Sequence, residues 1–368
     1  NIIQMNREHC YCVIMAGGTG VRFWPVSRAA KPKQFLDVAD TGKTFIQSTY
    51  ERFLKVVPQE NILIVTGDRY RDIVMEQLPY LAPENLLLEP YSRNTAPCIA
   101  YAAYTLLKRD PQARMVVTPS DHMIDNEELF AETIRNAFDH IEEKDVLMTL
   151  GVVPTRPDTN YGYIQACGGS DVYKNDRPMQ VKTFTEKPDR ELAKVFISTG
   201  EFFWNAGIFL WKAETIRKKM EKYLPEVTGL FKGWESALGT SVENEFIAKA
   251  YTGCRNISID YGVMEKTDEA WMYPVKFGWS DVGTWGSVYQ LSQKDRNENM
   301  LSHDGCYAYD TFKSIVSVAD GKVAVIKGLS NYIVVDTDDV LLVCPRSDEQ
   351  SIKKYIDDVR LDKGEKYV

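Results

Sequence analysis

"VIMAGGTGVRFWPVSRAAKPKQF", residues 13 to 35, joins a short apolar run to a glycine-rich loop and a group of cations. We predict that Val13 to Met15 form a buried strand, because the run is apolar and a glycine turn follows it. Glycines without a side chain let the backbone approach a bulky polar ligand closely. With Arg22, Lys31 and Lys33 close behind, the loop is typical of a phosphate site rather than of a solvated turn.

The loop matches neither of two common phosphate-binding motifs. A P-loop ends in Gly-Lys followed by Ser or Thr, whereas Gly20 precedes Val21 and Arg22. A dinucleotide fingerprint that began at Gly18 would need a further glycine at position 23, which is Phe23. The sequence therefore supports neither an ATPase loop nor a nicotinamide site.

Composition limits the class of protein. The chain has 368 residues, of which 44% are hydrophobic and 26% charged, as in ordinary globular domains. A formal net charge of −8 argues against a nucleic-acid partner, so phosphates must meet local cations or a metal ion. No apolar run approaches the roughly 20 residues of a membrane span, and we expect neither a membrane partner nor a leader peptide. The seven cysteines are scattered without zinc spacing, which favours a reduced, cytoplasmic protein.

The first half of the chain alternates short apolar runs with amphipathic stretches. This pattern predicts an α/β fold with a mostly parallel, Rossmann-like sheet flanked by helices. We predict strands at residues 11–16, 61–66, 86–89, 115–119 and 146–152. Unusual loops follow these strands, and in open α/β sheets the ligand crevice lies at the carboxyl ends of the strands. We therefore expect the loops to meet around one crevice.

The second half predicts the rest of this domain and a smaller one. Strand-like runs at 161–166, 181–186, 207–212 and 272–277, with two helical stretches, complete a domain of residues 1–286. Residues 287–368 form the second predicted domain, which is small and β-rich. Its short apolar runs lie at 315–318, 323–326, 332–335 and 340–343. We predict a terminal helix after them, with Ser347 and Gln350 as its capping box.

Three polar motifs offer chemistry, and each also has a purely structural interpretation. Asp121 in "PSDH" and Asp281 in "WSDVGTW" could ligate a hard cation with substrate phosphates, but could equally be a helix cap and a core edge. In "FTEKP", Glu186 could accept sugar hydroxyls while Lys187 pairs with a phosphate. The alternative there is an exposed charged turn before a proline.

Taken together, the motifs resemble those of the sugar-1-phosphate nucleotidylyltransferases, most closely their guanylyltransferase branch. The resemblance covers nearly the whole chain, and its motifs occur in the expected order. They are "AGGTGVRFWPVSR", "PKQF", "EPYSRNTAP", "PSDH", "NYGYI", "FTEKP", "WNAGIF", "SIDYGVMEK" and "WSDVGTW". The sequence departs from the family pattern in two ways. Phe23 stands where leucine is common in the family. Longer relatives append a cupin-type isomerase domain after this region, and without it we do not expect a bifunctional role.

The resemblance implies a role for particular residues. The nucleotide phosphates would bind to Gly17, Gly18, Thr19 and Gly20 with Arg22 and Lys33, and the guanine side to Glu89, Arg93, Asn94 and Thr95. The sugar phosphate would bind to Gly162, Glu186, Lys187 and Asn205, and magnesium to Asp121 and Asp281. Arg22, Lys33 and Lys187 would be catalytic. Asp260 lies in the motif "SIDYGVMEK", and the resemblance gives it no clear role.

The resemblance also implies an activity. The phosphate of mannose 1-phosphate would attack the α-phosphorus of GTP in line with magnesium present, releasing pyrophosphate and GDP-mannose. The C-terminal domain would be a left-handed β-helix that supports a homodimer. Alternatives are a nucleotidylyltransferase for another nucleotide or sugar 1-phosphate, a non-catalytic regulatory subunit that binds nucleotide sugar, and a nucleotide-binding module without a sugar site.

Overall fold

The computed structural model describes residues 7–18, 20–38 and 41–368. The chain divides into two compact units, each made of several segments. Unit 1 contains the residues up to Gly17, Thr49–Ser120 and Ile124–Trp279. Unit 2 contains Gly18–Ser48, Asp121–Met123 and Ser280–Val368. The expected domain boundary between residues 286 and 287 stays a prediction, and each unit is described by itself below.

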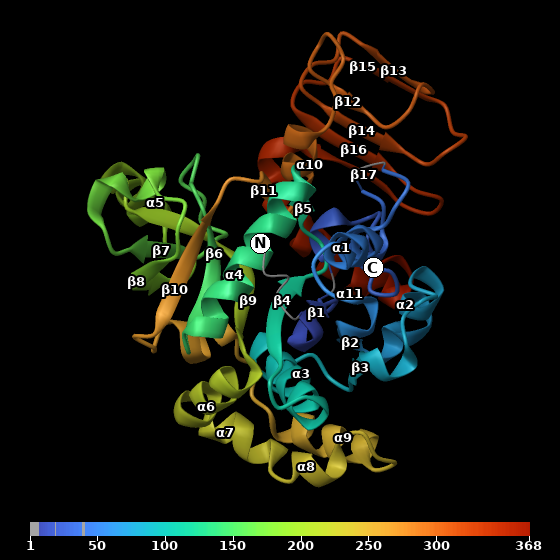
Figure 1. The fold of residues 1–368 in the computed structure, drawn as a ribbon. Helices are drawn as coiled ribbons and strands as arrows, with labels where there is room; N and C mark the ends of the chain where they lie inside the picture. The colour runs from blue at the N-terminus through green and yellow to red at the C-terminus, as the bar shows by residue number, and fades with distance from the viewer. Residues whose placement is uncertain (1–6, 19, 39–40) are drawn as a thin grey trace. The chain divides into compact units, whose positions relative to one another are not determined.

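Unit 1 is built on a nine-stranded mixed sheet (Figure 1). In spatial order its strands are β3 (Leu86–Glu89), β2 (Ile62–Gly67), β1 (Cys10–Met15), β4 (Arg114–Pro119), β9 (Phe202–Lys212), β6 (Leu147–Val152), β10 (Ala270–Val275), β8 (Met179–Thr185) and β7 (Tyr163–Ala166). Strands β3, β2, β1 and β4 are parallel, and β9 runs antiparallel to both β4 and β6. The predicted α/β class and the nine predicted strands are confirmed, with ends that shift by a few residues.

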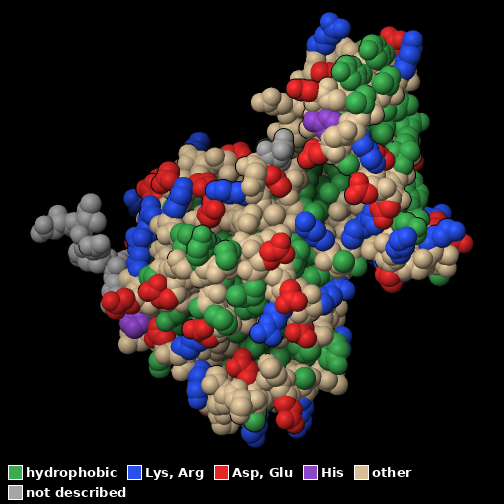
Figure 2. Space-filling model, turned by 90° about the vertical axis from the view of Figure 1, so that its right-hand side faces the viewer, with side chains coloured by type: hydrophobic (Ala, Val, Ile, Leu, Met, Phe, Trp, Pro, Cys, Tyr) green, Lys and Arg blue, Asp and Glu red, His purple; other side chains and the backbone are tan. Residues whose placement is uncertain are grey.

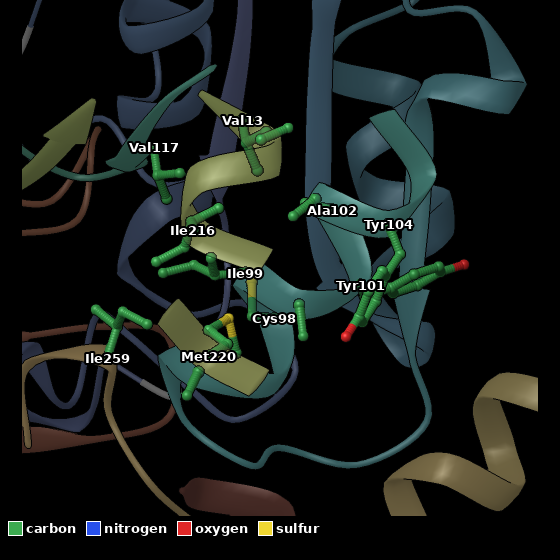
Figure 3. Close-up of a cluster of buried hydrophobic side chains, with 14 of the residues drawn as sticks. Val13, Cys98, Ile99, Tyr101, Ala102, Tyr104, Val117, Ile216, Met220 and Ile259 are labelled. Carbon is green, nitrogen blue, oxygen red and sulfur yellow. The ribbon is translucent and has the colours of Figure 1, made fainter. Parts of the chain in front are cut away.

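Helices cover both faces of this sheet. The neighbouring side chains of Val13 and Ile14 point to opposite faces, and both are fully buried. On one face α3 (Thr95–Arg109) packs on α6 (Ala213–Tyr223), where Ile99 lies against Ile216 (Figure 3). On the other face α4 (Glu127–Glu143) crosses β4, β6 and β9 (Figure 1).

The remaining helices of unit 1 correct one prediction. They are α2 (Arg71–Gln77), α5 (Arg190–Thr199), α7 (Pro225–Thr228), α8 (Trp234–Ala237) and α9 (Glu243–Gly253), while α1 (Phe45–Leu54) continues from unit 2 into unit 1. Two helical stretches were too few for residues 160–286, which contain the three longer helices α5, α6 and α9. The single turns α7 and α8 are too short to show a helical period. None of the helices in the described part of the chain combines the length and apolarity that a bilayer crossing requires.

Unit 2 contains a β-helix-like stack of short strands, which confirms the β-rich C-terminal prediction. The strands are β12 (Met300–Leu301), β13 (Cys306–Tyr309), β14 (Ile315–Val318), β15 (Ala324–Lys327), β16 (Tyr332–Asp336) and β17 (Leu341–Pro345). Each parallel pair skips the next strand in sequence, since β14 lies between β12 and β16, whereas β13 pairs with β15. Alternate strands therefore form two walls of a coil, and β17 closes one wall in the antiparallel direction.

The helices of unit 2 are α10 (Trp285–Leu291) and the predicted terminal helix, α11 (Ile352–Lys363). The predicted capping box is wrong, because residues 346–351 form a 3₁₀ turn and the hydroxyl of Ser347 donates to Asp348. A tertiary contact accounts for the difference: Glu349 in this turn accepts a hydrogen bond of 2.8 Å from the backbone N–H of Gly286.

Candidate functional site

The residues proposed from the sequence fall into both units. Unit 2 holds Gly18, Gly20, Arg22, Lys33, Asp121 and Asp281, and unit 1 holds Gly17, Glu89, Arg93, Asn94, Thr95, Gly162, Glu186, Lys187 and Asn205. Thr19 lies outside the described residues. Three clusters of these residues can be described within single units.

The first cluster is centred on the ammonium group of Lys33 in unit 2. Only 4% of Lys33 is exposed. Its Nζ lies 3.0 Å from Asp121 Oδ2 and donates a hydrogen bond of 2.5 Å to the carbonyl oxygen of Asp281. The rings of Phe23 and Phe45 lie 5.6 and 5.1 Å from the same nitrogen. A buried ammonium is thus paired with one carboxylate, one carbonyl and two aromatic faces, which offsets its desolvation.

Asp121 is ionised at neutral pH. Desolvation raises the pKa of its carboxyl, but the neighbouring charges of Lys33 and His122 outweigh this effect and hold the pKa below its ordinary value. The side chain remains 31% exposed, so a ligand can still reach it. An exposed, ionised carboxylate is the type of oxygen ligand that a hard cation takes.

Two glycines leave room for this cluster. At Gly20, φ is +55° and a Cβ would lie 2.7 Å from the backbone nitrogen of Lys33, so only glycine fits. At Gly283, a Cβ would lie 2.9 Å from Asp281 Oδ2 and 3.5 Å from Nη1 of Arg22. Arg22 itself is exposed. The glycine loop therefore packs directly on the backbone of Lys33.

No group of three or more potential metal-ligating side chains occurs among the described residues. Asp121 and Asp281 could hold a divalent cation only if other ligands completed its coordination. Substrate phosphates and water usually do so for magnesium, which needs few protein carboxylates. The two aspartates fit this type of site.

The second cluster lies in unit 1 around Glu89, at the end of β3. Oε1 of Glu89 accepts a hydrogen bond of 2.8 Å from the hydroxyl of the fully buried Tyr251. A Cβ at Gly17 would lie 4.0 Å from Oε2 of the same glutamate, so the first loop glycine faces this carboxyl. Burial raises the pKa of Glu89 to about 7, although the Tyr251 hydrogen bond lowers it in part.

The segment around Arg93 to Thr95 is tied to the motif that contains Asp260. Asn94 caps α3 with its side chain, and its backbone has a positive φ of 69°. The hydroxyl of Thr95 accepts a hydrogen bond of 2.8 Å from the N–H of Ile259, and the carbonyl of Arg93 accepts one of 3.2 Å from Ile257. The start of α3 therefore fixes the backbone just before Asp260.

The third cluster, also in unit 1, brings together Glu186, Lys187, Asn205 and Asp260. Glu186 forms an ion pair with Lys187, whose backbone has a positive φ of 46°. Nδ2 of Asn205 donates a hydrogen bond of 2.9 Å to Asp260 Oδ1. The pKa of Asp260 is raised to about 7, mainly by burial and to a smaller extent by the negative charge of Glu186.

Oε2 of Glu186 is buried and lacks a hydrogen-bond partner among the described residues. A Cβ at Gly162 would lie only 2.4 Å from this oxygen. The absence of a side chain at Gly162 therefore lets the carboxylate pack directly against the backbone of this glycine. A ligand hydroxyl would supply the missing donor.

Sequence reasoning missed Tyr251 of the second cluster and Thr149, whose hydroxyl donates a hydrogen bond of 2.9 Å to Oδ1 of Asn205 in the third. Tyr251 and Thr149 are buried in ordinary helical and strand patterns, and no local signal distinguishes them from core residues. Asp260 was noticed only through its motif. Its position beside Glu186 and Asn205 depends on contacts between segments distant in sequence.

Comparisons with known proteins show what the chain is similar to. The nucleotidyl transferase family profile matches residues 11–298, and a "MannoseP isomerase/GMP-like beta-helix domain" profile matches residues 307–359. The chain is 36% identical over 365 residues to a mannose-1-phosphate guanylyltransferase of Escherichia coli (strain K12), covering 97% of this chain and 75% of that protein. It is 35% identical over 367 residues to mannose-1-phosphate guanylyltransferase 2 of Escherichia coli O157:H7, covering 97% and 74% of the two chains.

A solved structure is similar over nearly its whole length. The crystal structure described as mannose-1-phosphate geranyltransferase from Thermus thermophilus superposes with a TM-score of 0.83 and 31% sequence identity. The match covers 96% of this chain and 99% of the other.

The raised pKa of Glu89 predicts a pH-dependent loss of stability. As pH rises from 4.5 to about 7, the unfolded chain releases this proton while the folded chain retains it, so the wild type loses stability. Glu89→Gln cannot titrate. The difference between the unfolding free energies of Glu89→Gln and the wild type should therefore shift in favour of the variant by roughly 1–3 kcal/mol across this range.

Urea unfolding at about pH 5 and about pH 8 measures this difference. The exposed Glu84 provides a matched control, because Glu84→Gln should follow the wild type at both pH values. A constant difference between Glu89→Gln and the wild type would contradict the prediction.

Proposed function

Because the chain belongs to the nucleotidyl transferase family, we propose that it transfers GMP from GTP to mannose 1-phosphate, giving GDP-mannose and pyrophosphate. The buried Lys33, paired with Asp121 and with the backbone of Asp281, is the observation that carries the proposal. A cation fixed between two aspartates beside a glycine loop suits a triphosphate. The names of the relatives supply the sugar and the nucleotide.

The reaction needs positioning and charge stabilisation more than a strong base. An oxygen of the sugar phosphate, already ionised at neutral pH, forms a new bond to the α-phosphorus of GTP. The bond from that phosphorus to the bridging oxygen of the β-phosphate breaks, and pyrophosphate leaves with the electron pair. We propose that the negative charge that develops on the leaving group is stabilised by Lys33, Arg22 and the loop of Gly17, Gly18, Thr19 and Gly20.

Asp121 and Asp281 are the residues that would hold magnesium. When bound, the ion supplies positive charge and Lewis acidity at the phosphate oxygens. The ionised state of Asp121 supports this assignment, because a protonated carboxyl is a poor ligand for a hard cation. Lys33 keeps the Asp121 carboxylate ionised and oriented.

We assign the substrate pockets to unit 1. The ammonium of Lys187 would pair with the phosphate of the sugar, while Gly162, Glu186 and Asn205 would meet its hydroxyls. The buried Oε2 of Glu186, which lacks a donor in the described part of the chain, supports a ligand rich in hydroxyl donors. The carboxyl of Glu89, together with Arg93, Asn94 and Thr95, would recognise guanine, whose ring edge offers N–H donors.

The first experiment measures pyrophosphate release with mannose 1-phosphate and GTP, dTTP, UTP or ATP, each with and without magnesium. We expect release with GTP and magnesium only. Release with another nucleotide would retain the mechanism but reject guanine recognition. No release from any nucleotide, together with binding of GDP-mannose, would favour a regulatory subunit.

Replacement of Lys33 tests its catalytic role. Lys33→Ala should lower turnover by about 100-fold or more, by analogy with the loss of one preorganised donor. Lys31, an exposed lysine two residues away, is the matched control, and Lys31→Ala should retain turnover within about threefold. Circular dichroism checks that both variants fold. A loss below about threefold in a folded Lys33→Ala variant would reject the role.

We also propose that the chain forms a homodimer through its β-helix-like stack. Tyr307, Tyr309, Val323 and Val325 of this stack are about half or more exposed, from 49% to 73%. Figure 2 shows hydrophobic side chains gathered on the part of the molecule that contains these strands. An exposed apolar patch of this kind is typical of a protein interface.

Sedimentation velocity tests the dimer. The wild type should sediment with twice the chain mass of 42.0 kDa. The double variant Tyr309→Lys and Val325→Lys should sediment as a monomer, because two charges would be buried in the apolar interface. Leu361→Lys, in which the replaced residue is 88% exposed on α11, should remain dimeric. A monomeric wild type would reject the proposal.

A further inference from the structure

The side-chain amide of Asn205 is held from both ends. Its Oδ1 accepts hydrogen bonds from the hydroxyl of Thr149 at 2.9 Å and from the backbone N–H of Gly207 at 3.1 Å. Its Nδ2 donates to Asp260 Oδ1 at 2.9 Å. Thr149 is fully buried in the middle of β6. A neighbour on the same strand and two segments far away in sequence thus fix one amide.

A bulge in β9 makes this arrangement possible. Between β6 and β9 the register shifts, so that Thr149 pairs with Phe209 but Gly151 pairs with Asn205. Gly207 lies inside the shifted stretch with a positive φ of 69°, which favours glycine. On the other side of β9, the regular pairing with β7 continues to Asn205, whose backbone N–H donates to the carbonyl of Gly162 at 2.8 Å. Asn205 is therefore bonded to the residue against which the Glu186 carboxylate packs.

The two ends allow only one orientation of the amide. If the amide were flipped, Oδ1 would face the carboxylate of Asp260, and Nδ2 would face the N–H of Gly207. The first contact would set two acceptors together, and the second two donors. The hydroxyl of Thr149 can rotate, but the Gly207 N–H and the Asp260 carboxyl cannot reverse their roles while Asp260 is ionised. The Gly207 N–H and the ionised Asp260 carboxylate together thus determine which way Nδ2 points.

We propose that Asp260 is a positioning residue for sugar-phosphate recognition, acting with Thr149 through the amide of Asn205. In this role it leaves the second N–H of Nδ2 to donate to a sugar hydroxyl oxygen, near the buried Oε2 of Glu186, which has no hydrogen-bond donor among the described residues. The pair then offers one donor and one acceptor to neighbouring hydroxyls of a hexose. This inference rests on the proposed function and adds a role for a residue that does not touch the reacting phosphates.

Substitutions at Asp260 separate orientation from charge. Asp260→Ala removes the acceptor and should raise KM for mannose 1-phosphate about tenfold, the effect of losing one hydrogen bond of ordinary strength. KM for GTP and kcat should change less than about threefold. Asp260→Asn removes the negative charge but keeps an acceptor, so it should stay within about threefold of the wild type in all three parameters.

Thr149→Val tests the other end of the amide. It should raise the same KM in the same direction, again without a large change in kcat. The double variant with Asp260→Ala should lose less than the product of the two single losses, because either change alone already frees the amide. If Thr149→Val fails to fold, as judged by circular dichroism, the comparison of Asp260→Ala with Asp260→Asn still decides the question.

Isothermal titration of each variant with mannose 1-phosphate, without nucleotide, distinguishes the two levels of the proposal. A wild type that binds no mannose 1-phosphate would reject the proposed function and this inference with it. Wild-type binding with a tenfold weaker Asp260→Ala variant and a near-normal Asp260→Asn variant is the expected result. Equal weakening in both variants would show that charge rather than orientation matters, and no weakening in either would also overturn the inference.

Discussion

The buried ammonium of Lys33 is the contact on which unit 2 depends. Unit 2 consists of three chain segments, and Lys33, Asp121 and Asp281 belong to one each. The ion pair and the hydrogen bond at Nζ therefore join all three segments at a single atom. Burying this ammonium without its partners would destabilise the fold by roughly several kcal/mol. The three segments are therefore strongly coupled. The close approach of Gly20 to the Lys33 backbone then fixes the glycine loop on the same point.

Three carboxyl groups of the candidate site differ in proton affinity because their neighbours differ. Asp121 is beside an ammonium, and its pKa is held low despite desolvation. Burial dominates at Glu89 and at Asp260, where the pKa rises to about 7 in each case. Tyr251 and Asn205 each supply one donor to these two groups, and one hydrogen bond offsets only part of the desolvation. At neutral pH Asp121 therefore suits a cation, whereas Glu89 and Asp260 are poised between two protonation states.

Much of the fold could be predicted because its signals are local. Apolar runs such as Cys10–Met15 and Ile62–Gly67 formed strands at the expected places, and each parallel strand ended at an unusual loop. The glycine at position 20 and the lysine at position 33 were recognisable as residue types that a phosphate site requires. The terminal capping box failed for the opposite reason: Glu349 bonds to the distant Gly286, and this contact overrides the local pattern.

The sequence by itself determined which segments become strands and which loops contain charged or flexible residues, since hydrophobic period and turn chemistry act over a few neighbours. Only the tertiary structure decided which of those residues touch. The bonds of Lys33 to Asp281 and of Glu89 to Tyr251 span 248 and 162 residues. The amide of Asn205 depends on a strand bulge that no local pattern announces. Such pairings follow from sheet register and from the need to satisfy buried charges, which are properties of the whole packed chain.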